Sequence, residues 1–456
     1  MTKCNHIVLA LCACSALSGC MREDYTTPQI DVMPYDGWVS ENVVPGEYSG
    51  GGWIKSFDDP KLILLVSQAL LHNNNLQSAA ADLDKAVAQA KRAGADLMPV
   101  LDLNAKIGRN GNSDTSDDAV SQYGVSLDIS WEADVWGRIR SGMRASVYDY
   151  YAAEGDYVAA RQSLIAQTAK AYFLVVETGK QLDLAMVFEK NLLETLDVTE
   201  SFYQEGLVSL QDVHLVNADI AKAAVSVQNA KSAYLGAMRS LEILLGRYPA
   251  ANTDIGKEFP VMPALVPVGL PSEILERRPD VRASERRVAA AFNRLEEARA
   301  AKLPAISLTG SLGGSSDHLT NLTDPRNVIW NTVGSVLFPI FNAGRLNADI
   351  DIQTAEQKFA ISKYKETALG AFSEVETFLS NEGLYRVRGG NLEKAYESSK
   401  SAEDIADERF KAGEVELLDL LQIKRSTITA NIDRVRAQRE LLDQRVNLHL
   451  SLGGSL

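Results

Sequence analysis

The stretch from Gln122 to Arg138, QYGVSLDISWEADVWGR, decides how this chain folds. Its first part alternates polar or small residues with apolar ones, which are Tyr123, Val125, Leu127, Ile129 and Trp131. Successive side chains of a β-strand point to opposite faces, so this period of two predicts a strand with one apolar and one wet face. The pattern stops before Trp136-Gly137-Arg138, where a turn into a helix is expected.

A very long helical pattern follows this strand. No proline interrupts the chain from Arg138 to Gln204, and a continuous helix of that length measures roughly 100 Å. After a turn at Glu205-Gly206, apolar or small residues recur at alternating spacings of three and four from Val213 to Leu244. This spacing is typical of a coiled-coil seam with left-handed supercoiling. Few soluble domains need such a helix, whereas a conduit across a wide compartment does.

The chain repeats itself with an offset of about 207 residues. Gly137-Arg138 recurs as Gly344-Arg345, and Leu245-Gly246 recurs as Leu452-Gly453. We expect a signal peptide over 1–19, an extended tether over 20–56, a first repeat over 57–247, a connector over 248–271 and a second repeat over 272–456. Each repeat begins with a helix. The strands are expected near 100–110, 122–131, 305–313 and 330–338, and the long helices near 138–204, 211–245, 345–411 and 418–452.

The four expected strands are close to the length that crosses a bilayer at a tilt. Four strands cannot close a barrel, and open sheet edges are not tolerated in lipid. The polar Asp102, Lys106 and Asp128 need a water-filled lumen, which requires more than eight strands. Three copies supply twelve. The sequence therefore predicts a mixed α/β membrane protein in which three copies form a 12-stranded β-barrel, four strands from each chain, together with a curved wall of long coiled-coil helices. A soluble amphipathic sheet on a helical bundle is the alternative.

Composition argues against several other classes of protein. The formal charge of −14 disfavours binding to nucleic acid. All four cysteines lie within the first twenty residues, and the five histidines are scattered without a metal-ligand spacing. No nucleophile elbow or phosphate-binding loop is present in the sequence. We therefore expect no enzyme activity, no catalytic residue, no metal site and no cofactor.

The first twenty residues indicate export to the cell envelope. The apolar run from Ile7 to Leu17 is too short for a membrane span and has the length of a signal-peptide core. It ends in Leu17-Ser18-Gly19-Cys20, which resembles a bacterial lipoprotein box. Cys20 would then be acylated after cleavage, and Met21 in place of aspartate favours the outer membrane. An ordinary signal peptide is the alternative.

Several motifs, taken in order, resemble the TolC-type outer membrane factor family in its lipoprotein branch. They cover nearly the whole chain from Cys20 onward. They are Trp53-x3-Phe57-x-Asp59-Pro60 in the first helix, Leu275-Glu276-Arg277-Arg278-Pro279-Asp280-Val281 in the centre, and the two strand-to-helix junctions at Trp131–Arg138 and Phe338–Arg345.

This resemblance implies a homotrimeric, passive exit duct of a tripartite efflux pump in the outer membrane, which exports small molecules. Its 12-stranded β-barrel would continue into a long periplasmic coiled-coil α-barrel. Its partners would be a periplasmic adaptor protein and an inner membrane pump of the resistance-nodulation-division (RND) type. The turns after the long descending helices would form the periplasmic aperture. The gate hypothesis places Gln211, Asp212, Phe410 and Asp419 there, whereas Gly137, Arg138, Gly344 and Arg345 are expected to be structural.

Two roles are possible for Asp212 and Asp419. They could form an acidic ring that constricts the pore and prefers cations, or each could complement the charge of a helix N-terminus. Val415 and Gln422 stand where some family members carry a gate arginine and a second aspartate. We therefore expect closure to depend more on packing and on Gln211, Asp212 and Phe410 than on a salt-bridge latch. For the whole chain, a channel for protein secretion and a lipidated coiled-coil adaptor are alternatives.

Overall fold

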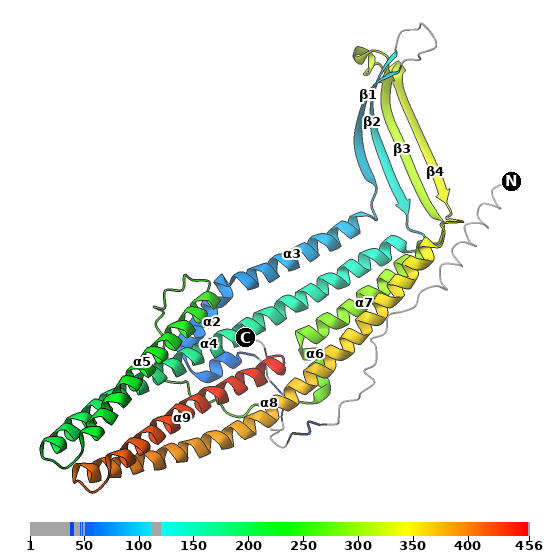
Figure 1. The fold of residues 1–456 in the computed structure, drawn as a ribbon. Coiled ribbons are helices and arrows are strands. Elements are labelled where there is room, and N and C mark those ends of the chain that lie inside the picture. The colour runs from blue at the N-terminus through cyan, green and yellow to red at the C-terminus, as the bar shows by residue number, and fades with distance from the viewer. Residues whose placement is uncertain (1–36, 41–45, 47, 49–50, 111–119, 455–456) are drawn as a thin grey trace. The chain divides into compact units, whose positions relative to one another are not determined.

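The computed structural model describes residues 37–40, 46, 48, 51–110 and 120–454. Its helices and strands follow one another in two similar series, one in each sequence repeat (Figure 1). The elements are η1 (Trp53–Phe57), α2 (Pro60–His72), α3 (Asn74–Ala95), β1 (Val100–Asn110), β2 (Val120–Ala133), α4 (Arg138–Gln204), α5 (Leu210–Leu244), η2 (Pro271–Glu273), α6 (Ile274–Arg277), α7 (Pro279–Ala300), β3 (Ala305–Ser316), η3 (Leu319–Asn321), η4 (Pro325–Asn327), β4 (Val328–Leu337), α8 (Arg345–Lys411) and α9 (Leu417–Ser451).

The chain divides into two compact units that cut across the sequence repeats. Unit 1 contains residues 82–155 and 283–366, and unit 2 contains the described residues before 82, those of 156–282 and those from 367 onward. The strands of both repeats lie in unit 1, and the paired helices α5 and α9 lie in unit 2. The repeats are therefore units of sequence and not separate spatial domains.

Unit 1 contains one antiparallel sheet of four strands in the order β1-β2-β3-β4. The pairing of β2 with β3 joins the two repeats, for example Leu127 with Leu312. The third strand reaches Ser316, although the alternating pattern ended at Gly313. Gly314, Ser315 and Ser316 still pair with β2, because the hydrogen bonds of a ladder join backbone groups and need no apolar side chain. Within the described chain, β1 and β4 each have one edge without a strand partner.

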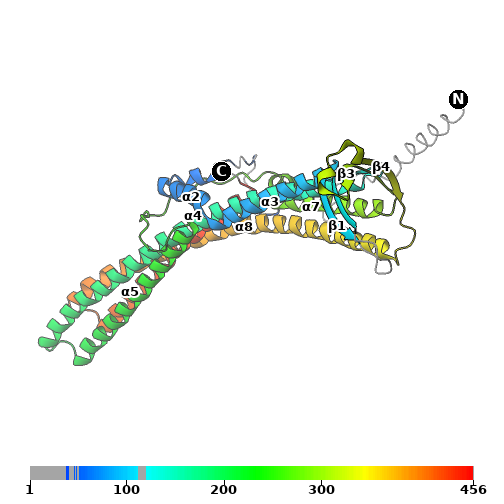
Figure 2. The same ribbon diagram turned by 90° about the horizontal axis from the view of Figure 1, so that it is seen from above.

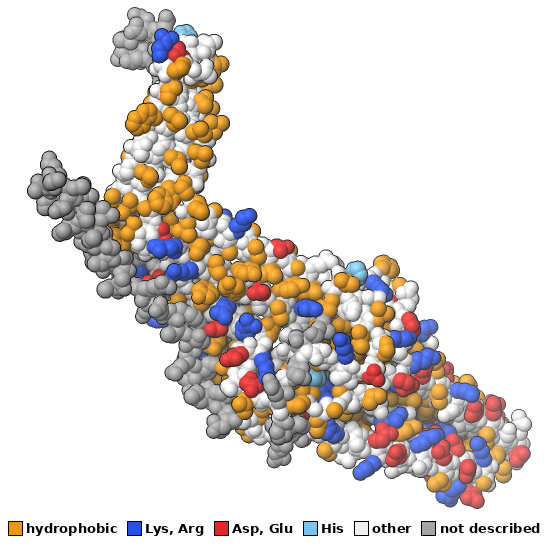
Figure 3. Space-filling model, turned by 180° about the vertical axis from the view of Figure 1, so that it is seen from behind, with side chains coloured by type: hydrophobic (Ala, Val, Ile, Leu, Met, Phe, Trp, Pro, Cys, Tyr) orange, Lys and Arg blue, Asp and Glu red, His pale blue; other side chains and the backbone are white. Residues whose placement is uncertain are grey.

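One face of this sheet is apolar over most of its length, with Arg109 opposite Ser121 near one end. Leu103, Leu127, Leu312 and Trp330 form one row across the four strands, and all four side chains are exposed in the single chain. Few charged side chains appear along the sheet in Figure 3. A continuous apolar face of this size requires lipid or protein against it. In the described chain, no helix is long and apolar enough to cross a membrane.

The long helices of the two repeats match in length and position. Helices α4 and α8 each have 67 residues, and α5 and α9 each have 35. The α5 seam is buried at Val213, Val216, Ala223, Val227, Ala237 and Leu241. Helix α2 begins as expected, since Asp59 accepts hydrogen bonds from the backbone N–H of Lys61 (2.9 Å) and Leu62 (3.1 Å) ahead of a proline in the first turn.

The core of unit 2 joins segments that lie far apart in the sequence. Phe57 and Leu62 pack with Tyr172 and Phe173 of α4, and Val446 of α9 belongs to the same cluster. The central signature is part of this arrangement. Arg278, which is buried, bonds to Asp280 at 2.7 Å and to Glu374 of α8 at 2.6 Å. The signature therefore ties the start of α7 to α8.

The connector after α5 is held by one buried carboxylate, Glu242. Its side chain is 1% exposed, and it accepts hydrogen bonds from the backbone N–H of Ala251 (2.6 Å), Asn252 (2.8 Å) and Thr253 (3.2 Å). Burial alone would raise the pKa of Glu242, but these donors outweigh it and lower the pKa below its ordinary value of 4.5.

We predict that Glu242→Gln lowers the stability of unit 2 by about 2 kcal/mol, because charge-assisted hydrogen bonds are lost. The loss is present at neutral pH and disappears as the pH falls below 4.5, since a lowered pKa adds stability only while the group is ionised. Thermal unfolding of the detergent-solubilised protein measures it. Glu258→Gln is the matched control, because this exposed carboxylate pairs with Lys180 at the surface. Equal melting of the two variants would contradict the assignment.

Candidate functional site

The polar face of the sheet carries one continuous row of hydrophilic side chains. Asp102 on β1 lies directly opposite Asp128 on β2, which is followed by Ser311 on β3 and Asn331 on β4. Like charges directly opposite each other destabilise a sheet. Asp128 is compensated by hydrogen bonds from Ser126 at 3.1 Å and from Ser311 and Asn104. This row therefore suits a surface that faces water.

The first strand-to-helix junction is held by two carboxylates. Asp134 accepts hydrogen bonds from the backbone N–H of Ile139 (3.0 Å) and Arg140 (2.9 Å). Although its burial acts in the opposite direction, these bonds lower the pKa of Asp134. Arg138 forms a bidentate pair with Glu132 at 2.9 Å, and Gly137 has a φ of +78°. The chain thus leaves the sheet and enters α4 through a fixed turn.

The second junction keeps the glycine turn, but Ala343 before the glycine also has a positive φ, of +52°, and the side chains are looser. Gly344 has a φ of +84°, whereas Arg345 is largely exposed and lies 3.9 Å from Asp349. The preceding Phe338, Ile340 and Phe341 are exposed as well. The repeat therefore preserves the turn at both junctions and the ion pair only at the first.

The turns that end α4 and α8 are built alike. Gly206 and Gly413 have φ values of +75° and +74°, a conformation that side chains rarely adopt. Each turn closes with a hydrogen bond back into its helix, from Leu207 N–H to Phe202 C=O at 2.8 Å and from Glu414 N–H to Arg409 C=O at 2.9 Å. Figures 1 and 2 show the two turns next to each other at one end of unit 2.

The four residues of the gate hypothesis lie at these turns in different environments. Asp212 accepts hydrogen bonds from Ser209 N–H at 2.9 Å and Ser209 Oγ at 2.7 Å, so it caps the start of α5. Gln211 is exposed beside it. Asp419, in the first turn of α9, is exposed and borders a cavity of about 640 Å³ that Val415 and Gln422 also line. The two aspartates are therefore not equivalent.

Phe410 is buried at 4% exposure and does not project freely from the turn. Its ring lies 5.7 Å from that of Phe202. The surrounding cluster includes Leu192 and Val216 of the first hairpin and Leu417, Leu420 and Leu421 of the second. Phe410 thus holds the α4–α5 and α8–α9 hairpins together by packing.

Cys20, the expected lipid attachment site, lies outside the described residues. Within the described part of the chain, no three His, Cys, Asp or Glu side chains are grouped so that they could hold a metal ion.

A family model described as "Outer membrane efflux protein" matches residues 65–247 and again residues 270–454, one match for each sequence repeat. The chain belongs to this family. This outer membrane efflux protein is 31% identical over 410 residues to the solvent efflux pump outer membrane protein SrpC of Pseudomonas putida, covering 87% of this chain and 86% of SrpC.

Two further comparisons extend over nearly all of this outer membrane efflux protein. The probable outer membrane lipoprotein SilC of Salmonella typhimurium is 26% identical over 459 residues, with 98% of each chain covered. The crystal structure of the Campylobacter jejuni CmeC outer membrane channel covers 95% of this chain and 94% of its own, with a TM-score of 0.89 and 26% identity.

These comparisons confirm the predicted fold and function. The protein is an outer membrane channel of an efflux pump assembly, and its family is a family of channels. Three copies complete the twelve-stranded barrel, in which the unpaired edges of β1 and β4 meet neighbouring subunits. The apolar face of the sheet then faces lipid, and the row from Asp102 to Asn331 faces the lumen.

The sequence patterns did not predict the charges buried between the helices of unit 2. Asp219 of α5 pairs with Arg425 of α9 and lies 3.3 Å from Lys222, and Lys424 pairs with Asp407 of α8 at 2.7 Å. In the sequence, each buried charge is marked only by being a polar residue one or two positions from an apolar seam residue. That mark does not identify the residue with which the charge pairs.

A second buried group lies farther along α9. Arg439 pairs with both Glu177 of α4 and Asp443, and the second oxygen of Asp443, Oδ1, has no hydrogen-bond partner in the described structure. Burial raises the pKa of Asp443 to about 6. The charge of Glu177 raises this pKa as well, whereas the charges of Arg439 and Lys170 lower it.

We predict that Asp443→Asn raises the thermal midpoint at neutral pH. Because the pKa of Asp443 is higher in the folded protein than its ordinary value of 3.8, protonation of this carboxyl favours the folded state. This contribution to stability is complete below pH 3.8 and is lost as the pH rises through about 6. The gain should therefore shrink as the pH is lowered toward 4. Asp433→Asn is the control, since Asp433 is an exposed partner of Arg436 on the same helix. A gain that does not depend on pH would refute this account.

Proposed function

We propose that this outer membrane efflux protein is the passive exit duct for small molecules of an RND-type pump, reached through a periplasmic adaptor. The observation that carries this proposal is the sheet with one apolar and one polar face, joined through fixed junctions to paired helical hairpins. A duct needs no chemistry of its own, and we infer that the protein catalyses no reaction.

The relatives support small molecules over proteins as cargo. The name of SrpC describes a solvent efflux pump. The lumen-facing row of the sheet offers carboxylate, hydroxyl and amide groups, which suits hydrated solutes. Protein secretion remains the second candidate, because a wide duct by itself does not exclude a polypeptide.

We further propose that Cys20 is acylated and anchors the chain to the outer membrane. The likeness to SilC, whose name describes a probable outer membrane lipoprotein, supports this proposal. Several acyl chains, each contributing about 0.8 kcal/mol per buried CH₂, would hold the N-terminus in the leaflet.

The aperture proposal combines packing with charge. Phe410 and its cluster hold the two hairpins closed, and Asp419 supplies most of the charge effect because Asp212 is already bonded to Ser209. Three copies place three of each aspartate around one axis. Rings of carboxylates favour cations in a narrow pore.

We predict that the double substitution Asp212→Asn and Asp419→Asn reduces cation selectivity and changes single-channel conductance in planar bilayers. Asparagine keeps an acceptor for Ser209, so the start of α5 stays capped while the charge is lost. Asp419→Asn alone should produce most of the change. Asp404→Asn, at an exposed carboxylate of α8 paired with Lys400, is the control. Unchanged conductance and selectivity in the double variant would exclude these side chains from gating.

The pump assignment is tested by photo-crosslinking in cells with the natural partners present. A crosslinking residue at Leu207, exposed in the α4–α5 turn, should capture an adaptor, and the complex should copurify with an RND-type pump. The same residue at Tyr248, exposed in the connector after α5, is the control and should not capture the adaptor. Recovery of a protein-secreting transporter at Leu207 would favour the second candidate.

A further inference from the structure

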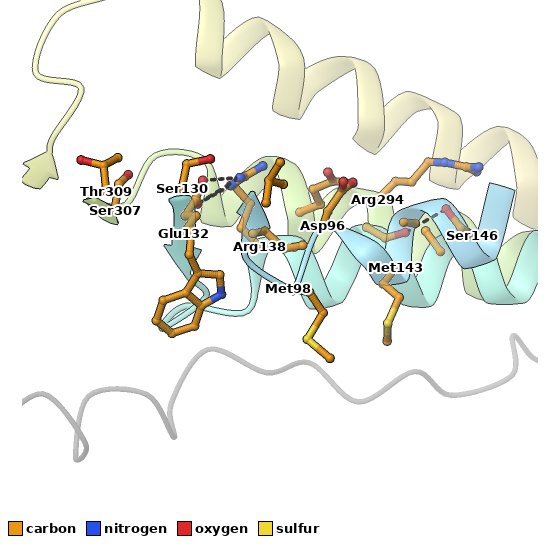
Figure 4. Close-up of a pocket in the computed structure, with 17 residues that line it drawn as sticks. Asp96, Met98, Ser130, Glu132, Arg138, Met143, Ser146, Arg294, Ser307 and Thr309 are labelled. Carbon is orange, nitrogen blue, oxygen red and sulfur yellow. Dashed lines mark hydrogen bonds and ion pairs between the residues drawn. The ribbon is translucent and has the colours of Figure 1, made fainter. Parts of the chain in front are cut away.

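A cavity of about 550 Å³ lies in unit 1 where the polar face of the sheet meets the end of α3 and the helices α4 and α7 (Figure 4). We refer to it as the junction cavity. Its lining includes Ser130, Ser307 and Thr309 from the lumen-facing side of the sheet. The volume is in the range of pockets that hold drug-sized molecules. These three residues share a face with the polar row, so this part of the lining lies on the polar side of the sheet.

One carboxylate in the junction cavity lacks an ion pair. The carboxyl atoms of Glu297 lie 2.9 Å from the position that a Cβ on Gly142 would occupy, so the group rests directly against the backbone of α4. In the described chain, the carboxylate of Glu297 takes part in no salt bridge or hydrogen bond, and only its backbone C=O accepts one, from Ala301 N–H. Burial raises its pKa despite the attraction of Arg138 and Arg294. Such a carboxylate gains most from a cation that enters the cavity.

The two arginines near Glu297 are bound elsewhere. Arg138 is engaged by both oxygens of Glu132, as the dashed lines in Figure 4 show. Arg294 pairs with Asp149. A second carboxylate, Asp96, lines the cavity just after the end of α3 and is exposed. With the two arginines neutralised, the cavity has an excess of negative charge.

Apart from Ser146, the rest of the lining is apolar. Met98 and Met143 extend to the same side in Figure 4, and Ile139, Val100 and Trp131 also line the cavity. Methionine is flexible and polarisable, so it adapts to ligands of different shape. Aromatic and thioether groups together favour a flat or aromatic organic cation over a small hydrated ion.

We propose that the junction cavity is a binding site for amphipathic organic cations, with Glu297 and Asp96 as counter-charges and Met98 and Met143 as the apolar contact. It would hold such a molecule briefly where the helical wall passes into the barrel. Its place on an export path rests on the proposed function, but the binding itself requires only the trimer.

The test measures fluorescence anisotropy of rhodamine 6G, an amphipathic cation, with the purified trimer in detergent. Glu297→Gln should weaken the affinity about fivefold and Asp96→Asn about twofold, as expected for partly exposed ion pairs. Met143→Lys, which places a positive charge in the cavity, should weaken it further. Asp84→Asn, at an exposed position on α3 away from the cavity, is the matched control. The anion fluorescein should bind poorly to every variant.

The proposal is overturned if Glu297→Gln and Met143→Lys bind rhodamine 6G as tightly as the unsubstituted trimer, or if fluorescein binds equally well. Trimer migration and circular dichroism establish that each variant is folded before it is measured. The result is separable from the pump assignment. Crosslinking at Leu207 can fail while the cation site is present, and the site can be absent while the adaptor still binds.

Discussion

The structure depends on one constraint: the backbone groups at the open edges of β1 and β4 need partners that hydrocarbon cannot supply. A soluble sheet satisfies its edges with water, but this sheet has an apolar face that excludes water on one side. The only arrangement that satisfies both is closure with sister subunits. The polar row from Asp102 to Asn331 then surrounds a lumen, since its two facing carboxylates are tolerable only in contact with water and hydroxyl donors. Trimerisation, membrane insertion and the existence of a pore thus follow from the same hydrogen-bond requirement.

The helical part solves a different problem, which is how to hold a wall of long helices in register. Apolar seams such as that of α5 supply the packing, but a uniform seam permits sliding by one repeat. Buried pairs such as Asp219 with Arg425 and Lys424 with Asp407 occur at single positions along the seam. Breaking such a pair leaves an unpaired buried charge, which is strongly destabilising. We therefore infer that these pairs contribute to the register of the helices, although Arg425 is about half exposed. The apolar cluster around Phe410 adds packing between the hairpins near the turns.

Much of this arrangement could be predicted from the sequence because it is local. The strand from Gln122 is recognisable by its period of two residues, and the helix that contains Val213 to Leu244 by its period of about 3.5 residues. The glycine turns recur at a constant offset, as Gly206 and Gly413 show. The positions of Asp212 and Asp419 beside these turns followed from the same repeat, but their contacts did not. Asp212 and Asp419 occupy matching positions, yet only Asp212 is bonded to a neighbouring serine, because Glu416 and not serine precedes α9. A one-residue difference in the cap decides which carboxylate is available.

By itself, the sequence determined the number of strands per chain, the two-faced character of the sheet, the lengths of the helices and the need for three copies, since each depends on residues adjacent in the chain or at a fixed period. Only the tertiary structure decided which charges pair and which remain unpaired. Glu297 lies against Gly142 and beside two arginines that are already engaged, an arrangement that joins α4 and α7 across more than 150 residues of sequence. Contacts of this kind depend on how the surfaces of distant elements meet, and no periodicity along the chain encodes the identity of the partner.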